Sequence, residues 1–142
     1  FAGNTAFVDI NLVKGTLIQS FDFYKGLSHP FSKAAYMMFV MSEVHPFLDG
    51  NGRIARVMMN AELVKAGQSK IIIPTIYRED YMGALRRLTR QGDPDPYIRM
   101  LQRAHEFSEN IFGDDMNEMQ EYLIQTNAFL EHTEAKLKII TR

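Results

Sequence analysis

The sequence predicts an all-α domain, and three observations support that prediction. Apolar residues recur at helical spacing along most of the chain, as at positions 13, 17, 21, 24 and 27. Glycine and proline fall between the periodic stretches, where they end helices rather than interrupt them. Only Ile71–Pro74 favours a short strand or an extended plug, and Pro74 would stop it. We therefore expect helices joined by short loops, with at most a minor β element.

Each helix can be placed from its periodicity and its flanking residues. The first is expected within Leu12–Leu27, and the second within Phe31–Val44, with Ser28 as N-cap candidate and Pro30 in its first turn. Phe31–Val44 is apolar nearly all round, which predicts a buried central helix. The remaining helices are expected from Arg53 to Gly67, over Arg78–Arg90, from the Asp93-Pro94-Asp95-Pro96 cap to about Phe112, over Asp114–Thr126 and over Phe129–Ile140.

Length and composition narrow the class of protein. A chain of 142 residues suits a single domain spanning 1–142, and because it begins with Phe1 rather than Met we expect a fragment that lacks N-terminal residues. A net charge of −1 gives no general attraction to nucleic acid or anionic membranes, so neither is an expected partner. The sequence has no cysteine and no apolar run long enough to span a bilayer, which fits a cytoplasmic protein.

The segment from His45 to Arg56 carries the chemistry. Two glycines and a proline make His45–Gly52 a loop between two helices. The Gly50-Asn51-Gly52 turn runs into a helix N-terminus, where free backbone N–H groups and the helix dipole attract an anion. Asn51 tolerates the left-handed conformation and adds an amide donor. This arrangement predicts a site for phosphate.

Charged side chains surround that turn. Arg53 and Arg56 share a helix face, where two like charges cost roughly 0.2–0.5 kcal/mol unless an anion lies between them. Their planar guanidinium groups suit phosphate oxygens. Asp49 can pair with an arginine or hold Mg²⁺, and His45 is a candidate general base. We expect Phe47 to anchor the loop in the core.

Simpler interpretations exist for the separate parts. Asn51-Gly52 alone is a common turn, the arginines alone could form a solvated face, and Asp-Gly-Asn-Gly lacks the acids of a calcium loop. The Arg86-Arg87…Arg90 cluster favours a solvated helix face over a target-docking patch. Structural roles are expected for the other histidines and core roles for five methionines: His29, His105, His132, Met37, Met38, Met41, Met58 and Met59.

The complete string His-Pro-Phe-Leu-Asp-Gly-Asn-Gly-Arg-Ile-Ala-Arg over 45–56 resembles the signature of the Fic (filamentation induced by cAMP) family, in the Fic/Doc superfamily. All fixed positions of that signature are met. The similarity extends through Val13–Leu27 and the IIIPTIYREDYMGALRRL segment, over most of the chain. The resemblance implies a Fic-type helical domain, with the motif loop between two central helices.

Fic proteins typically transfer AMP from ATP to a hydroxyl of a target protein, with Mg²⁺. The resemblance therefore implies that His45 deprotonates a Ser, Thr or Tyr hydroxyl and that Asp49 holds Mg²⁺ against the α- and β-phosphates. It also implies that the Gly50-Asn51-Gly52 backbone and the Asn51 side chain cradle the phosphates, and that Arg53 and Arg56 bind the β- and γ-phosphates and orient ATP. Catalytic roles would thus fall on His45, Asn51, Arg53 and Arg56, and Tyr77 or Tyr81 is a candidate adenine contact, although packing explains either tyrosine equally well.

Other features of the family guide further expectations. The phosphorylating Doc branch replaces the second glycine and lacks the late arginine, so Gly52 and Arg56 favour the adenylylating branch, while transfer of another phosphate-containing group such as phosphocholine stays open. Phe1–Asp9, with a turn at Gly3-Asn4, is the candidate for the β-hairpin flap of Fic sites. The inhibitory motif does not occur in the sequence, because His105 stands where Ser or Thr should precede Glu109. A separate partner such as an antitoxin, or a preceding segment, would have to supply it.

A second hypothesis comes from a different class of protein. The chain could be a helical interaction module, such as a regulator or half of a toxin–antitoxin pair, that binds nucleotide without turnover. The intact motif favours the enzyme, since a decayed site would be free to lose His45 or Arg56. The target, which could be the protein itself, is not encoded in any pattern of the sequence.

Overall fold

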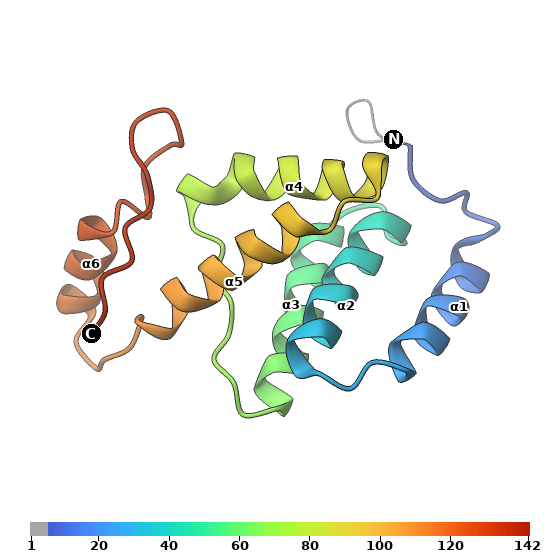
Figure 1. Ribbon diagram of the computed structural model, residues 1–142, viewed down its shortest axis with the longest axis horizontal. Helices are drawn as coiled ribbons and strands as arrows, with labels where there is room; N and C mark the ends of the chain where they lie inside the picture. The colour runs from blue at the N-terminus through green and yellow to red at the C-terminus, as the bar shows by residue number, and fades with distance from the viewer. Residues whose placement is uncertain (1–5) are drawn as a thin grey trace. The chain divides into compact units, whose positions relative to one another are not determined.

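The computed structural model describes residues 6–142 and contains helices and loops, with no strand in that range. Figure 1 shows the elements in chain order: α1 (Val13–Lys25), α2 (Pro30–Val44), α3 (Asn51–Lys65), a 3₁₀ turn η1 (Thr75–Tyr77), α4 (Arg78–Gln91), α5 (Asp95–Glu109) and α6 (Met116–Gln125). The expected all-α class is thus confirmed. Contacts divide the chain into unit 1, Phe1–Gln68, and unit 2, Ser69–Arg142, and each is described by itself.

Unit 1 is built on the packed helix pair α2 and α3, which correspond to the predicted central helix and its successor. Met38, Met59 and Leu63 are fully buried, and Met41 is nearly so. Met37 and Met58 are less deeply placed, so the predicted core role holds for three of the five methionines. This tightly packed pair holds both ends of the loop that joins α2 to α3.

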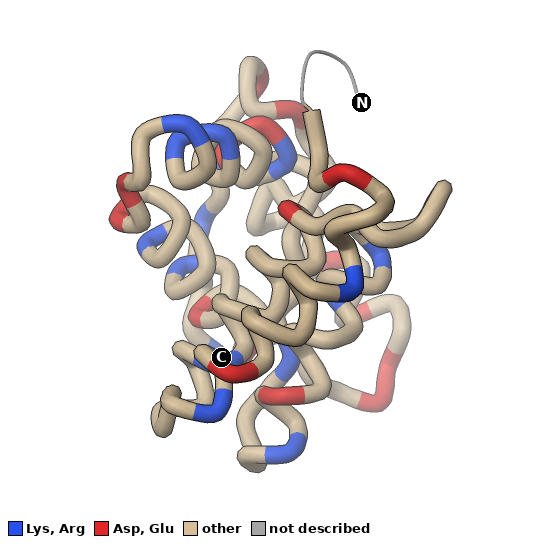
Figure 2. Tube along the Cα trace, turned by 90° about the vertical axis from the view of Figure 1, so that its right-hand side faces the viewer, with Lys and Arg blue, Asp and Glu red and all other residues tan. Residues whose placement is uncertain are grey.

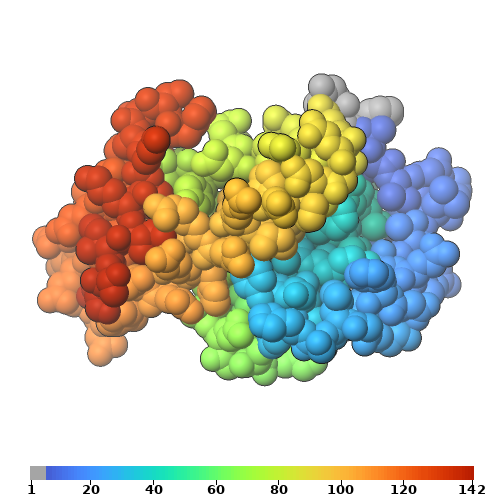
Figure 3. Space-filling model, viewed as in Figure 1, coloured from blue at the N-terminus to red at the C-terminus, as the bar shows by residue number. Residues whose placement is uncertain are grey.

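Helix α1 packs on this pair through one face only. The Tyr36 hydroxyl donates to the Ser20 carbonyl at 3.1 Å, and the Tyr24 hydroxyl donates to a Glu62 carboxylate oxygen at 2.6 Å. That hydrogen bond to Glu62, with burial, raises the pKa of Tyr24 to about 12. Ile18 and Phe21 of α1 are exposed, and part of the surface of this helix is visible in blue in Figure 3.

The helix ends follow local chemistry. Gly67, in the left-handed region at φ 72°, terminates α3 as expected. The N-cap residue of α2 is His29, one position after the predicted Ser28, and Pro30 is the first residue of the helix. No side chain forms a capping hydrogen bond at this end. Proline at the first position needs no N–H partner and its φ suits a helix, so the start does not depend on Ser28.

Unit 2 packs α4 and α5 around Leu101, Ala104 and Phe107, all fully buried. Ile71–Pro74 forms the extended plug rather than a strand, because Ser108 binds it: the Ile72 N–H donates to Ser108 Oγ at 2.8 Å. Helix α6 begins after Asp115, whose carboxylate accepts from the N–H groups of Asn117 and Glu118.

The helix predicted over Phe129–Ile140 is wrong. After α6 the chain turns at Asn127, with φ 66°, and returns without regular structure. The Lys138 N–H donates to the Thr126 carbonyl at 3.0 Å, and the Tyr122 hydroxyl donates to the Ile140 carbonyl at 2.7 Å. These bonds to α6 replace the bonds that a helix would have formed within the segment.

No helix of residues 6–142 is both long enough and apolar enough to cross a membrane. Basic and acidic residues are interspersed along the trace, as Figure 2 shows, in keeping with the net charge of −1. Binding of an anion must therefore depend on a local arrangement of groups.

Candidate active site

The candidate site is the loop between α2 and α3, and it begins at His45. This residue ends α2 in the left-handed conformation, with φ 52° and ψ 55°, while its N–H still donates to the Met41 carbonyl at 3.2 Å. Pro46 disfavours a helical conformation at the residue before it, which explains why α2 stops here. A left-handed non-glycine residue is uncommon and is a reason to suspect function.

The buried side chain of Asn51 holds the loop through hydrogen bonds to its backbone. This side chain is 3% exposed; its Oδ1 accepts from the Phe47 N–H at 2.9 Å and its Nδ2 donates to the Phe47 carbonyl at 2.7 Å. The backbone at Phe47 is therefore fixed by an amide on the next helix. The predicted anchoring of the Phe47 ring in the core is wrong: the ring is 50% exposed, because Asn51 holds this part of the loop by its backbone instead.

Among residues 6–142, no side chain caps the N-terminus of α3. Gly50 is its N-cap residue, at φ 79°, and neither a capping side chain nor an acidic residue is present in the first turn. A left-handed backbone at this position favours glycine. The first N–H groups of α3 consequently point out of the helix without an intrahelical partner, as an anion-binding helix end requires.

Two guanidinium groups fold back over this helix end. A Cβ built on Gly50 would lie 3.5 Å from Arg53 Nη2, and a Cβ built on Gly52 would lie 3.5 Å from Arg56 Nη1. Helical side chains lean toward the N-terminus, so residues one turn along are placed to do this. Gly50, Gly52, Arg53 and Arg56 thus lie together at one helix end, whereas the Asn51 side chain, predicted to cradle phosphate, is turned to the Phe47 backbone. The phosphate-binding roles of all five residues stay predictions.

Asp49 lies at the edge of the same site. Its side chain is 92% exposed, and its Oδ2 lies 3.2 Å from Arg53 Nη2. An exposed ion pair of this kind contributes only about 0–1 kcal/mol, so either partner can exchange it for another ligand. A single accessible carboxylate beside a phosphate-type site fits Mg²⁺, which takes one or two carboxylates and completes its shell with phosphate oxygens and water. Residues 6–142 contain no group of three or more His, Asp or Glu side chains arranged for a metal.

One residue in contact with the site escaped the sequence analysis. The ring of Phe7 stacks on the His45 imidazole, with 3.7 Å between ring centroids and 9° between ring planes. The two residues are far apart in the sequence, and Phe7 precedes α1 in a segment without periodicity. The candidate flap Phe1–Asp9 lies in part outside the described residues, and its described residues 6–9 form a loop rather than a strand.

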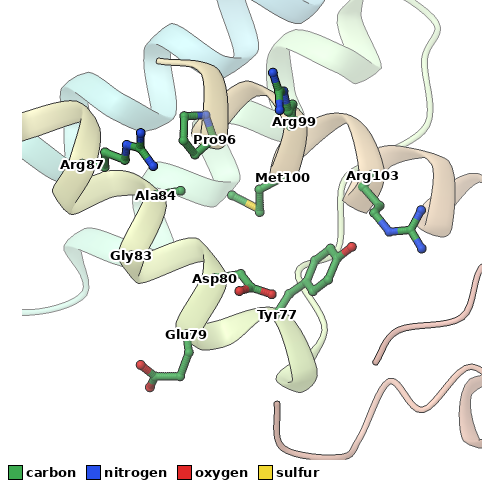
Figure 4. Close-up of a pocket in the computed structure, with 10 residues that line it drawn as sticks. All are labelled: Tyr77, Glu79, Asp80, Gly83, Ala84, Arg87, Pro96, Arg99, Met100 and Arg103. Atoms are coloured by element: carbon green, nitrogen blue, oxygen red, sulfur yellow. The ribbon is translucent and has the colours of Figure 1, made fainter. Parts of the chain in front are cut away.

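The candidate adenine contacts belong to unit 2. Tyr77 lies in η1 and Tyr81 in α4, and both are buried. Tyr77, Asp80 and Met100 line a groove of about 470 Å³ between α4 and α5. Figure 4 shows these side chains and the helices that carry them. Burial raises the pKa of Tyr77, and the neighbouring Arg103 partly offsets that rise. A role for either tyrosine in binding adenine stays a prediction.

The residues assigned simpler roles have ordinary surroundings. His105 lies 3.1 Å from Ser69 Oγ and 3.7 Å from a Glu109 carboxylate oxygen, a structural setting as expected. In the arginine cluster of α4, Arg87 pairs with Asp93 at 2.9 Å, which supports the solvated-face interpretation for that residue.

Comparison with known proteins places these observations in a family. The model of the Fic/DOC family matches residues 2–63, which include the whole of the loop. Curated relatives, both named protein adenylyltransferase Fic, are 35% identical over 103 residues in Drosophila persimilis and 34% identical over 106 residues in Drosophila willistoni. These matches cover 70% and 72% of this chain and 20% and 21% of the relatives, so the chain spans about a fifth of their length.

Solved structures agree with that result. A variant of Fic-1 from C. elegans superposes with a TM-score of 0.62 at 26% identity, over 84% of this chain and 34% of that chain. A signaling protein from Bacteroides thetaiotaomicron that contains a Fic domain shares the fold, with a TM-score of 0.58 at 24% identity over 73% of this chain and 48% of that one. With the complete motif on an open helix end, the chain belongs to the Fic/DOC family.

Proposed function

We propose that this chain is the catalytic part of a Mg²⁺-dependent protein adenylyltransferase, which moves AMP from ATP to a Ser, Thr or Tyr hydroxyl of a target protein. The observation that carries the proposal is the uncapped N-terminus of α3 with two guanidinium groups folded over its glycines. The relatives named adenylyltransferase support the choice of reaction.

The proposed reaction uses His45 as general base. Its imidazole takes the proton of the target hydroxyl, the hydroxyl oxygen forms a bond to the α-phosphorus, and the bond from that phosphorus to the bridging oxygen breaks. Pyrophosphate leaves with the electron pair. A general base of this kind contributes roughly 10²–10⁴ in rate. His45 ends α2 in the left-handed conformation and begins the loop that leads to α3.

The phosphates would occupy the end of α3. The N–H groups of the first turn and the guanidinium groups of Arg53 and Arg56 would bind phosphate oxygens and orient the α-phosphorus for in-line attack. Asp49 would exchange its contact with Arg53 for Mg²⁺, which would supply charge neutralisation on the α- and β-phosphates. Positioning and electrostatic stabilisation are the main catalytic contributions expected in such a transfer.

Gly52 supports adenylylation over phosphorylation. The residue is exposed and its backbone is helical, so no conformational reason requires a glycine there. Its lack of a side chain keeps the first turn of α3 open beside the Arg56 guanidinium. A nucleotide can therefore approach the backbone closely at this position. Together with Arg56, this is the feature in which the loop differs from the phosphorylating branch.

The test uses ATP labelled at either the α- or the γ-phosphate, with Mg²⁺ and with candidate targets that include the protein itself. We expect transfer of the α-label by the unmodified chain and its loss in His45→Ala. The matched control is His29→Ala, which removes an exposed histidine from the opposite end of α2.

Each alternative has its own outcome. Transfer of the γ-label alone would show phosphorylation and overturn the proposal. Tight binding of ATP with no transfer of either label would favour the nucleotide-binding regulatory module. Equal loss of transfer in His29→Ala and His45→Ala would show that the effect is not specific to the base.

A further inference from the structure

We propose that Phe7 is a positioning residue for the general base: its ring fixes the plane of the His45 imidazole and so directs the proton-accepting nitrogen toward the target hydroxyl. This inference rests on the proposed function of the site. It concerns a residue outside the His45–Arg56 loop, contributed by the segment that precedes α1.

The stack is close and nearly parallel. The ring centroids of Phe7 and His45 are 3.7 Å apart and the ring planes are inclined by 9°, so one whole face of the imidazole is covered. Both residues are half-buried. A contact of this geometry restrains rotation of the imidazole about its Cβ–Cγ bond, because any rotation separates the two faces.

No hydrogen bond within residues 6–142 orients this imidazole. A catalytic histidine is usually held by a hydrogen bond from one ring nitrogen to a carboxylate or carbonyl. The His45 ring makes no such bond in that range, and the stack on Phe7 is its defined ring contact. The left-handed turn and the N–H bond to Met41 restrain the backbone of His45, but neither contact involves the ring.

Stacking is also compatible with the chemistry of a base. The lone pair that accepts a proton lies in the plane of the imidazole, at the ring edge. A partner on the ring face leaves both nitrogens at that edge accessible to the target hydroxyl. Phe7 thus fixes the orientation of the His45 ring, as a hydrogen-bonded carboxylate or carbonyl does in other sites. Unlike such a partner, it leaves both ring nitrogens available.

The first measurement is of the contact itself and does not depend on activity. In the unmodified chain, NMR should show nuclear Overhauser contacts between the Phe7 ring protons and the imidazole protons of His45, whose resonances should carry an upfield ring-current shift. We expect Phe7→Leu to abolish the shift and Phe7→Tyr to retain it. Phe21→Leu is the matched control, since it removes an exposed stacked phenylalanine from α1 in the same unit.

The second measurement separates positioning from binding. With labelled ATP and target, Phe7→Leu should lower kcat about tenfold, a fraction of what a general base contributes, and should leave the KM for ATP within about twofold. Phe7→Tyr should restore kcat, because it keeps a flat ring of the same size. Phe21→Leu should change neither constant.

Three results would overturn the inference. They are a missing Phe7–His45 contact in the unmodified chain, imidazole resonances that do not move in Phe7→Leu, and equal kcat values for Phe7→Leu and Phe7→Tyr. Failure of the proposed function looks different, because then the unmodified chain transfers no α-label while the NMR contact is still present.

Discussion

The N-termini of α3 and α6 differ in how their first backbone N–H groups, which have no partner within the helix, are satisfied. At α6, the Asp115 carboxylate accepts from two N–H groups of the first turn, and Glu118 adds a favourable negative charge. At α3, no side chain caps the helix, no acid lies in the first turn, and two arginines bring positive charge to the positive end of the dipole. The end of α6 is capped by a side chain of the chain itself, and the end of α3 is not, which is the arrangement that the proposed binding of an anion requires.

Asn51 makes the contrast sharper. It is the first residue of α3, where a polar side chain could help to satisfy the helix, yet its amide is turned back to the Phe47 backbone. The end of α3 is therefore left open by a specific set of hydrogen bonds and not by a lack of polar residues. Four changes test this comparison, and they are ordered by the size of the effect that each should have.

The strongest effect should come from the arginines. Arg53→Gln and Arg56→Gln should each lower kcat/KM for transfer of the α-label by about 10²–10³-fold, the loss typical when one preorganised donor to a developing negative charge is removed. Steady-state kinetics with labelled ATP measure it. Arg99→Gln on α5, where the arginine is exposed and lies 4.0 Å from Asp95, is the control and should have no effect. Similar losses in all three variants would contradict a specific phosphate site at α3.

Asn51→Ala should be the most destabilising of the four changes. It leaves the N–H and the carbonyl of Phe47 without the partners that close the loop, which should lower the free energy of unfolding by about 1–3 kcal/mol. Urea denaturation followed by circular dichroism measures this difference. Asn117→Ala, at an exposed asparagine of α6, is the comparison for an asparagine outside the loop. An unchanged midpoint in Asn51→Ala would mean that the loop closes without the amide.

Asp115→Ala should remove the cap of α6 and lower the free energy of unfolding by about 1 kcal/mol. The same denaturation experiment reports the loss, and Asp115→Asn should restore most of it because asparagine also accepts from the first N–H groups. Transfer activity should be unaffected. A larger loss of activity than of stability in Asp115→Ala would contradict the separation of roles between the two helix ends.

Arg56→Gln should slightly stabilise the protein, whereas Asn51→Ala and Asp115→Ala should destabilise it. Without nucleotide, it removes repulsion between two arginines one turn apart and should raise the free energy of unfolding by about 0.2–0.5 kcal/mol. The same variant should be deficient in transfer. Arg56→Lys, which keeps the charge, is the matched control and should show no gain. A loss of stability in Arg56→Gln would mean that the free protein already satisfies this guanidinium.

The sequence predicted unit 1 better than the end of unit 2, for physical reasons. The limits of α2 and α3 depend on local signals: Pro30, Pro46 and the glycines act on their immediate neighbours, and the apolar periodicity is strong. The tail after α6 has a helical pattern as well, but Asn127 Nδ2 donates to the Lys136 carbonyl at 2.9 Å and Leu137 is buried. The conformation of this tail is determined by contacts with residues distant in the sequence, and no local sequence pattern predicts such contacts.

The same distinction applies within the site. The order of charges and glycines predicted an anion-binding helix end, and the structure brings those groups together. Two features could not be predicted. The Asn51 amide could equally have faced the phosphate, since both choices satisfy its donors and acceptor, and the Phe7–His45 stack joins distant parts of the chain. The base, metal and phosphate roles stay predictions, which transfer from labelled ATP tests directly.

Binding of nucleotide at the open end of α3, as proposed, would also link the occupancy of the site to the lifetime of the protein. A ligand that binds only the folded state adds RT ln(1 + [L]/Kd) to its stability, about 2.7 kcal/mol when the ligand is at 100 times its Kd. A nucleotide phosphate at this helix end would accept hydrogen bonds from the uncapped N–H groups. It would also reduce the repulsion between the Arg53 and Arg56 guanidinium groups. Molecules without nucleotide would then unfold more often and meet proteases sooner, so the amount of this protein would follow the supply of its own substrate.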